Sequence, residues 1–315
     1  MGINISFLPL IAKALSHANS GEMLMYGVQD IEFTIKEAMN YFDLENTTCN
    51  SSSYDAHGFF KELGFSKVSA LDISNFEGAE YIFDLNETVP DYMHDKFDFI
   101  YDGGTLEHIF NIPAALSNGV AMLKKGGIIF HHSPMNNWVN HGFYQFSPTL
   151  FFDYYMANGF ANCSLFLFKE DGGVKRFGPR DMIPSEYYEI NTLLAFVAQK
   201  ISNNNPVIPQ QSAYTYSTNM LAGEIKNSPL YIWGTSERFT KLYMDWFNAN
   251  KEDLNFLGFI DSSLDKQAMD YCGYKVHPPS ILEESPSNTV VIVAASFLEV
   301  RDLIPDLYMN LRFIR

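Results

Sequence analysis

The 315-residue sequence predicts an α/β protein with a doubly wound, mostly parallel Rossmann-like sheet, followed by a second, smaller α/β domain. Two observations support this prediction. Short apolar runs alternate with helix-like stretches through the first 200 residues, which is typical of parallel strands joined by right-handed crossovers. A polar stretch with prolines at 202–219 then precedes a new alternation. We therefore expect domains at 1–200 and 229–315, with a linker at 201–228.

The expected strands of the first domain are short apolar runs that end at turn residues. They cover 22–26, 67–74, 80–86, 97–101 and 127–132. Thr34 and Glu37 have the spacing of a capping box before one helix, and Gly64 suits the left-handed end of the next. Ser147 followed by Pro148 indicates another helix start. An amphipathic helix, and no signal peptide, is expected at the N-terminus.

The second half of the chain begins with an ambiguous segment. Periodicity at 187–200 fits a strand or a helix, and its later alternation favours a strand that completes the first sheet. In the smaller domain we expect one strand before Gly234, one ending at Asp261 and a buried one at 288–296, followed by a helix from 297. The aromatic residues of the helix after Gly234 have a core-facing spacing.

Charge and cysteine content exclude several classes of protein. The 21 basic and 37 acidic residues give a net charge of -16, which disfavours nucleic acid and anionic membranes as partners. Cys49, Cys163 and Cys272 are far apart, so neither a disulfide framework nor a structural zinc site is expected. No apolar run reaches the roughly 20 residues that span a bilayer. We expect a cytoplasmic protein, and leave open whether it forms a homo-oligomer.

The stretch 97–134 contains most of the titratable side chains expected near a site. Ligands of open α/β sheets bind beyond the carboxyl ends of the strands. The residues expected at that edge are Asp102, Gly103, Glu107, His108, His131 and His132. Strand alternation places His131 and His132 on opposite faces of the sheet. This stretch therefore predicts an active site.

Residues 20–170 resemble the class I S-adenosylmethionine-dependent methyltransferases of the broad type 11 kind. The resemblance is carried by ALDIS (70–74), FDLN (83–86), FDFIYDGGTLEHI (97–109), LKKGG (123–127) and HGFYQFSP (141–148). It implies S-adenosyl-L-methionine as the cofactor, and it assigns a role to each matching residue.

These roles follow the parts of the cofactor. The resemblance places Asp72, with Ile73 beside it, at the ribose hydroxyls, where a carboxylate offers only acceptors. It places Asp84 at the adenine amino group, with Leu85 beside the ring. It places Asp102 and Gly103 beside the methionine part.

The first motif of the family, G-x-G-x-G, is altered in this chain. Gly27 is present, but Gln29 and Ile31 occupy the second and third glycine positions. Side chains there narrow the approach of a ligand, since glycine permits close contact. Two alternatives follow: either Asp30 or Gln29 binds the cofactor's ammonium and carboxylate by its side chain, or cofactor binding is lost.

Methyl transfer requires the acceptor to be held close to the methyl group, and often a base to take a proton. The candidates are His108, His141 and Tyr144, the last two in an aromatic loop. No metal-ligand set with a recognisable spacing is present, so no metal site is expected. The smaller domain resembles the Rossmann-like domain of bacterial sugar-modifying enzymes.

The sequence therefore predicts a methyltransferase for a small or glycan-linked acceptor, such as a sugar or nucleotide-sugar. The first alternative is a non-catalytic, methyltransferase-like binding or assembly protein with a degenerate cofactor turn. The second is a dinucleotide oxidoreductase, which the absence of G-x-G-x-x-G and the presence of FDLN disfavour.

Overall fold

The computed structural model divides into two compact units, Met1–Pro179 with Tyr188–Gln210 and Arg180–Tyr187 with Gln211–Arg315. The described residues are 2–16, 18–42, 55–169, 173–179, 181–203, 206–209, 211, 225–237, 239, 243–267, 269–295 and 311–314. Three predicted segments lie largely or wholly outside them: the loop at 45–55, the linker at 201–228 and the helix from 297.

The first unit is built on an eight-stranded sheet with the order β5-β4-β2-β6-β7-β10-β8-β9. Its strands are β2 (Glu22–Tyr26), β4 (Lys67–Asp72), β5 (Tyr81–Ile82), β6 (Phe97–Gly103), β7 (Leu123–Asn136), β8 (Phe160–Phe168), β9 (Val174–Phe177) and β10 (Thr192–Lys200). Neighbours from β5 to β7 pair in parallel. β10 runs antiparallel to both β7 and β8, and β9 runs antiparallel to β8. The predicted mostly parallel sheet is confirmed, and the ambiguous segment at 187–200 contains the strand β10.

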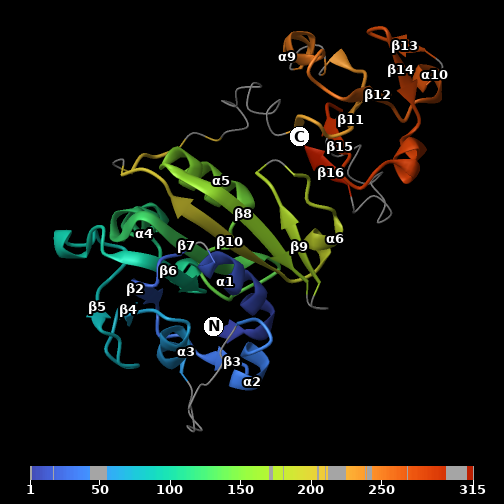
Figure 1. Ribbon diagram of the computed structural model, residues 1–315. Coiled ribbons are helices and arrows are strands. Elements are labelled where there is room, and N and C mark those ends of the chain that lie inside the picture. The colour runs from blue at the N-terminus through green and yellow to red at the C-terminus, as the bar shows by residue number, and fades with distance from the viewer. Residues whose placement is uncertain are drawn as a thin grey trace. The chain divides into compact units, whose positions relative to one another are not determined.

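Helices cover both faces of this sheet (Figure 1). They are α1 (Leu8–Leu15), α2 (Ile35–Ala38), α3 (Ala56–Glu62), α4 (Ile112–Met122) and α5 (Pro148–Ala157). On one face, Phe59 and Phe60 of α3 join a core with Phe99 and Phe130. On the other face, the Tyr155 ring of α5 stacks on a β10 phenylalanine, with 5.5 Å between ring centroids. The doubly wound arrangement is therefore confirmed.

The predicted helix ends are present. The Thr34 amide donates to Glu37 Oε2 at 2.8 Å, and the Glu37 amide donates back to Thr34 Oγ1 at 3.3 Å. Gly64 follows α3 with φ +97°. Ser147 Oγ accepts the amide of Thr149 at 3.4 Å, with Pro148 at the first helical position.

The second unit contains a six-stranded sheet with the order β13-β14-β12-β11-β15-β16. Its elements are β11 (Leu230–Trp233), α9 (Met244–Asn250), β12 (Phe256–Ile260), α10 (Leu264–Gln267), β13 (Asp270–Tyr271), β14 (Tyr274–His277), β15 (Val290–Val293) and β16 (Arg312–Ile314). Phe239, Trp246 and Phe247 are buried in its core, as their spacing predicts. The smaller α/β domain is therefore present, and β16 adds a strand that the sequence did not indicate.

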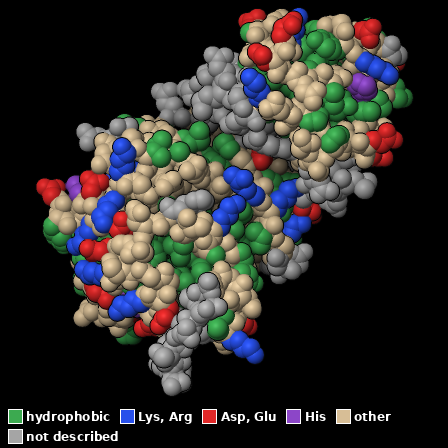
Figure 2. Space-filling view, viewed as in Figure 1, with side chains coloured by type: hydrophobic (Ala, Val, Ile, Leu, Met, Phe, Trp, Pro, Cys, Tyr) green, Lys and Arg blue, Asp and Glu red, His purple; other side chains and the backbone are tan. Residues whose placement is uncertain are grey.

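Two surface properties bear on partners. On the visible face of the first unit, basic side chains are interspersed with acidic ones (Figure 2). Among the described residues, no helix combines the length and apolar character needed to cross a membrane.

Candidate functional site

The carboxyl ends of β2, β4 and β6 lie side by side. Tyr26, the last residue of β2, pairs with Leu71 of β4 on one side and with Asp102 of β6 on the other. The turns that follow these three strands therefore open onto one edge of the sheet, where the sequence predicted the cofactor residues.

The turn after β2 requires its glycine. Gly27 has φ +72°, a conformation that other residues rarely adopt. A Cβ atom added there would lie 3.0 Å from Thr105 Oγ1 and 3.9 Å from Asp72 Oδ2. Asp72 Oδ1 accepts the Ser74 amide at 3.0 Å, whereas its Oδ2 faces the Gly27 turn. The Asp72 carboxylate therefore faces the Gly27 turn, and we call the sheet edge formed by Gly27, Asp72 and Gly103 the crevice.

Gln29 occupies part of this crevice. Its side chain is buried, and Nε2 donates to the Tyr26 carbonyl oxygen at 2.7 Å. Its Oε1 has no hydrogen-bond partner among the described residues. A Cβ added to Gly103 would overlap with that oxygen, so the amide lies directly over the end of β6. The crevice between β2 and β6 thus holds an unpaired buried acceptor.

Ile31, the other replacement of a family glycine, lies elsewhere. It begins β3 (Ile31–Glu32), which pairs in parallel with β1 (Ile3–Asn4), and it packs against the hydrophobic core. The prediction that Ile31 narrows the cofactor turn is therefore wrong. Asp30 is exposed, and its carbonyl oxygen accepts the Ile3 amide at 2.7 Å.

The segment predicted to contact adenine lies beside the end of β4. The amide of Phe83 donates to the Asp72 carbonyl oxygen at 2.9 Å. Asp84 follows, and its Oδ1 accepts the Asn86 amide and side chain at 2.9 and 2.7 Å. Leu85 is buried, whereas Ile73 is 69% exposed. Ile73 follows β4 and the Asp84 turn follows β5, and because these strands are parallel neighbours, both lie at the edge that carries Asp72.

Asp102 has a structural role that the sequence did not indicate. Its carboxylate is fully buried, and accepts the amides of Thr105 and Leu106 at 2.9 and 3.2 Å. Its Oδ2 lies 2.7 Å from His131 Nδ1, and His131 Nε2 lies 2.5 Å from the Tyr155 hydroxyl. The carboxylate predicted for the cofactor is thus engaged inside the protein.

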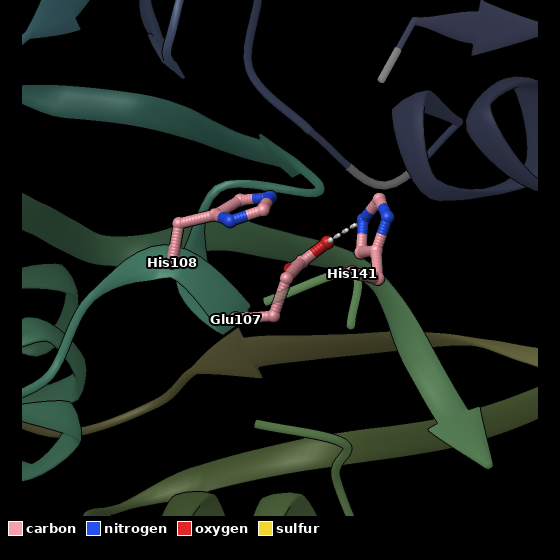
Figure 3. A group of neighbouring side chains, drawn as sticks. All are labelled: Glu107, His108 and His141. Atoms are coloured by element: carbon pink, nitrogen blue, oxygen red, sulfur yellow. Dashed lines mark ion pairs between the residues drawn. The ribbon is translucent and has the colours of Figure 1, made fainter. Parts of the chain in front are cut away.

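Glu107, His108 and His141 meet beyond the end of β6 (Figure 3). Glu107 and His108 belong to η3 (Leu106–His108), and His141 lies in the loop after β7. One ligand atom from each lies within 4.8 Å of the other two. His141 Nε2 is 3.5 Å from Glu107 Oε1, and the two histidine ring centroids are 5.2 Å apart. We call these residues the Glu–His–His trio.

Burial governs the ionisation of the trio. Glu107 has no exposed surface, and neither carboxylate oxygen makes a hydrogen bond of ordinary geometry to the described residues. Burial, followed by the negative charge of Asp102, raises the pKa of Glu107 to about 8. Burial, followed by the charge of His141, lowers the pKa of His108. Tyr144 lies outside the trio, because its hydroxyl donates to the Phe110 carbonyl oxygen at 3.0 Å.

A cleft of about 540 Å³ lies beside the trio. Its polar lining consists of Asn4, Ser6, Glu32, His132, Lys169 and Asn191. Trp138 also lines it, and the Trp138 ring packs edge-on against His141 at 5.5 Å. Burial lowers the pKa of His132 to about 3, so this histidine is neutral.

Sequence reasoning placed the crevice but missed two features. The sequence placed Glu107 at the edge of the sheet but gave it no role. Glu107 lies close to His141 only because of a loop 34 positions further along the chain. Sequence reasoning also missed the cleft, whose lining comes from the N-terminus, β3, β7 with the loop after it, and the segments around β8 and β10. No local signal in the sequence brings these segments together.

No protein-family model and no curated protein matches this sequence. Solved structures do match. A SAM-dependent methyltransferase from Archaeoglobus fulgidus is 13% identical, with 61% of this chain and 94% of that chain covered and a TM-score of 0.37. The 1,6-didemethyltoxoflavin-N1-methyltransferase of Burkholderia thailandensis, with S-adenosylhomocysteine bound, is 14% identical. The match covers 63% of this chain and 78% of that chain, with a TM-score of 0.35. Likeness at this level says nothing about activity, which has to rest on the site itself.

Proposed function

We propose that this protein is an S-adenosylmethionine-dependent methyltransferase that acts on a small acceptor. The observation that carries the proposal is the shared crevice of Gly27, Asp72 and Gly103 at three neighbouring strand ends. The sheet order supports it. Dinucleotide-binding sheets have the order 3-2-1-4-5-6, whereas here the antiparallel β10 lies between β7 and β8.

The crevice has the donors and acceptors that the cofactor needs. Asp72 Oδ2 is available for the ribose hydroxyls, and the exposed Ile73 offers an apolar surface to adenine. The positive φ of Gly27 lets the backbone approach the ligand. The unpaired Gln29 Oε1 is an acceptor for the ammonium group of the methionine part. When bound, the cofactor supplies a methyl group on an activated sulfonium.

The acceptor is assigned to the cleft beside the trio. Its polar side chains and the Trp138 ring suit a sugar or nucleotide-sugar, because sugars combine hydroxyl groups with apolar ring faces. In protein without a metal ion at the trio, His108 or His141 would take the proton that an oxygen or nitrogen acceptor releases. A second argument for a sugar is an analogy: the smaller domain resembles the Rossmann-like domain of bacterial sugar-modifying enzymes.

Calorimetric titration with S-adenosylhomocysteine tests the proposal. We expect binding to the wild type, and a loss of roughly 10-fold or more in Asp72→Ala, since a charged hydrogen bond contributes about 1.5–3 kcal/mol. Asp91→Ala, at an exposed position of η2 (Asp91–Met93), is the matched control and should bind normally. Folded wild-type protein that does not bind the ligand would refute the proposal.

One observation favours the second candidate, a methyltransferase-like binding protein. The Gln29 amide already fills part of the crevice. If it excludes the cofactor, wild-type protein will not bind S-adenosylhomocysteine, whereas Gln29→Gly will. If Gln29 Oε1 instead binds the ammonium group, Gln29→Gly will weaken an affinity that the wild type already has. The same calorimetric assay on these two proteins separates the candidates.

A further inference from the structure

We propose that the Glu–His–His trio is a binding site for one divalent transition-metal ion. The sequence indicated no metal site, because its ligands come from two segments. In the structure, the three ligand atoms lie within 4.8 Å of one another. Donor atoms bound to one zinc ion at about 2.0–2.2 Å lie about 3–4 Å apart. Small side-chain adjustments therefore bring the trio to metal-binding distances.

The Glu107 carboxylate has one possible charged neighbour, His141, which lies at ion-pair distance and makes no hydrogen bond to it. It is fully buried, and neither oxygen makes a hydrogen bond of ordinary geometry to the described residues, although the Ser133 hydroxyl acts on it and opposes the rise that burial causes in its pKa. His141 Nε2, 3.5 Å away, also makes no hydrogen bond to the described residues. A buried carboxylate without hydrogen bonds is costly, whereas a cation between Glu107 and His141 would satisfy both groups. These atoms without hydrogen bonds point to a ligand that the site is built to accept.

The backbone fixes the distance between the two segments. The Glu107 carbonyl oxygen accepts the amides of Phe143 and Tyr144 at 2.8 and 3.2 Å. A Cβ added to Gly142 would lie 2.8 Å from that same oxygen, so only glycine allows this approach. The His141 loop is thus held against η3 by main-chain bonds, independently of the trio's side chains. Such pre-organisation is expected of a metal site.

The donor set selects the class of ion. Two imidazoles and one carboxylate suit Zn²⁺, Co²⁺, Mn²⁺ or Fe²⁺, whereas Mg²⁺ and Ca²⁺ prefer oxygen ligands. Three protein ligands leave coordination positions open, as in catalytic zinc sites. His141 adjoins Trp138 of the cleft, so an open position would take an oxygen of the acceptor. Only this last step rests on the proposed function.

Titration of the chelator-treated, full-length protein with Co²⁺ tests the metal site directly. We expect one Co²⁺ per chain, with visible absorption bands and displacement by Zn²⁺ but not by Mg²⁺. Glu107→Gln, His108→Ala and His141→Ala should each weaken binding by roughly 10- to 100-fold or more, since second-shell changes alone cost that much. His57→Ala is the matched control, because His57 pairs with Glu80 at 3.3 Å elsewhere in the unit.

Two results would overturn the proposal: no Co²⁺ or Zn²⁺ binding by the folded wild type, or binding that the three trio variants leave unchanged. His108 is exposed, so His108→Ala keeps the test valid even if a change at Glu107 prevents folding. S-adenosylhomocysteine binding in the presence of chelator is the separate readout of the proposed function. If the protein binds the metal ion but not S-adenosylhomocysteine, the proposed methyltransferase function is refuted and the proposed metal site is retained.

Discussion

Replacing Asp102 with asparagine should destabilise the first unit strongly. Asp102, His131 and Tyr155 form a buried series of hydrogen bonds. All three side chains have a partner when His131 Nδ1–H donates to Asp102 and Nε2 accepts from the Tyr155 hydroxyl. An asparagine oxygen can still accept the amides of Thr105 and Leu106, but its NH₂ group then faces the His131 donor. The lost charged hydrogen bond costs about 1.5–3 kcal/mol, and the unpaired buried donor adds about 1–3 kcal/mol.

The expected loss in the free energy of unfolding is therefore about 2.5–6 kcal/mol. At roughly 2–4 °C per kcal/mol for a unit of this size, the melting temperature should fall by about 5–24 °C. Urea unfolding and thermal melts followed by circular dichroism measure both quantities.

Asp98→Asn is the matched control on the same strand. Asp98 bonds the Glu22 amide at 2.9 Å and Lys124 Nζ at 2.7 Å, but Lys124 is partly exposed and can turn to water. This change should cost only about 1 kcal/mol. The reasoning fails if Asp102→Asn lowers the free energy of unfolding by no more than Asp98→Asn does. It also fails if its effect is simply additive with that of His131→Gln, since contacting groups should couple by about 0.5–3 kcal/mol.

Three further changes test other parts of the structure. Gly142→Ala should push the loop from the Glu107 carbonyl and weaken Co²⁺ binding by roughly 10-fold, measured by titration. Lys200→Met leaves two buried carbonyls without the ammonium that bonds them at 2.8 and 2.6 Å, and should cost about 2–4 kcal/mol in urea unfolding. Burial opposes ionisation of Asp261, but hydrogen bonds led by Thr235 outweigh it and lower its pKa. The ionised Asp261 carboxylate should therefore stabilise the folded state fully above about pH 5, and this contribution should fade toward about pH 3. In Asp261→Asn, the free energy of unfolding should change less over that pH range.

The sequence predicted local features well. β2 begins and ends where its apolar run does, and the capping box of Thr34 and Glu37 forms as its spacing requires. Such features depend on a few neighbouring residues, so they can be inferred without the fold. Gly27 and Asp72 were placed correctly at the strand ends for the same reason.

Features that depend on distant pairs were not predicted. The Asp102 carboxylate turns inward because His131 lies on the neighbouring strand, which no local pattern reveals. The approach of His141 to Glu107 depends on main-chain bonds between a loop and η3. Likewise, Ile31 leaves the crevice because β3 pairs with the N-terminal β1. In each case the tertiary partner decided the position of the side chain.

The central place of β10 has a consequence for synthesis of the chain. β10 is the last strand of the first unit to be translated, yet it joins β7 to β8. Translation of the 64 positions between 136 and 200 takes about 3–13 s at roughly 5–20 residues per second. During that time the edge of β7 has no neighbour, and an open edge can pair with another chain. Fragments that end before residue 192 should therefore aggregate, and the first unit should reach its native sheet only after β10 has left the ribosome.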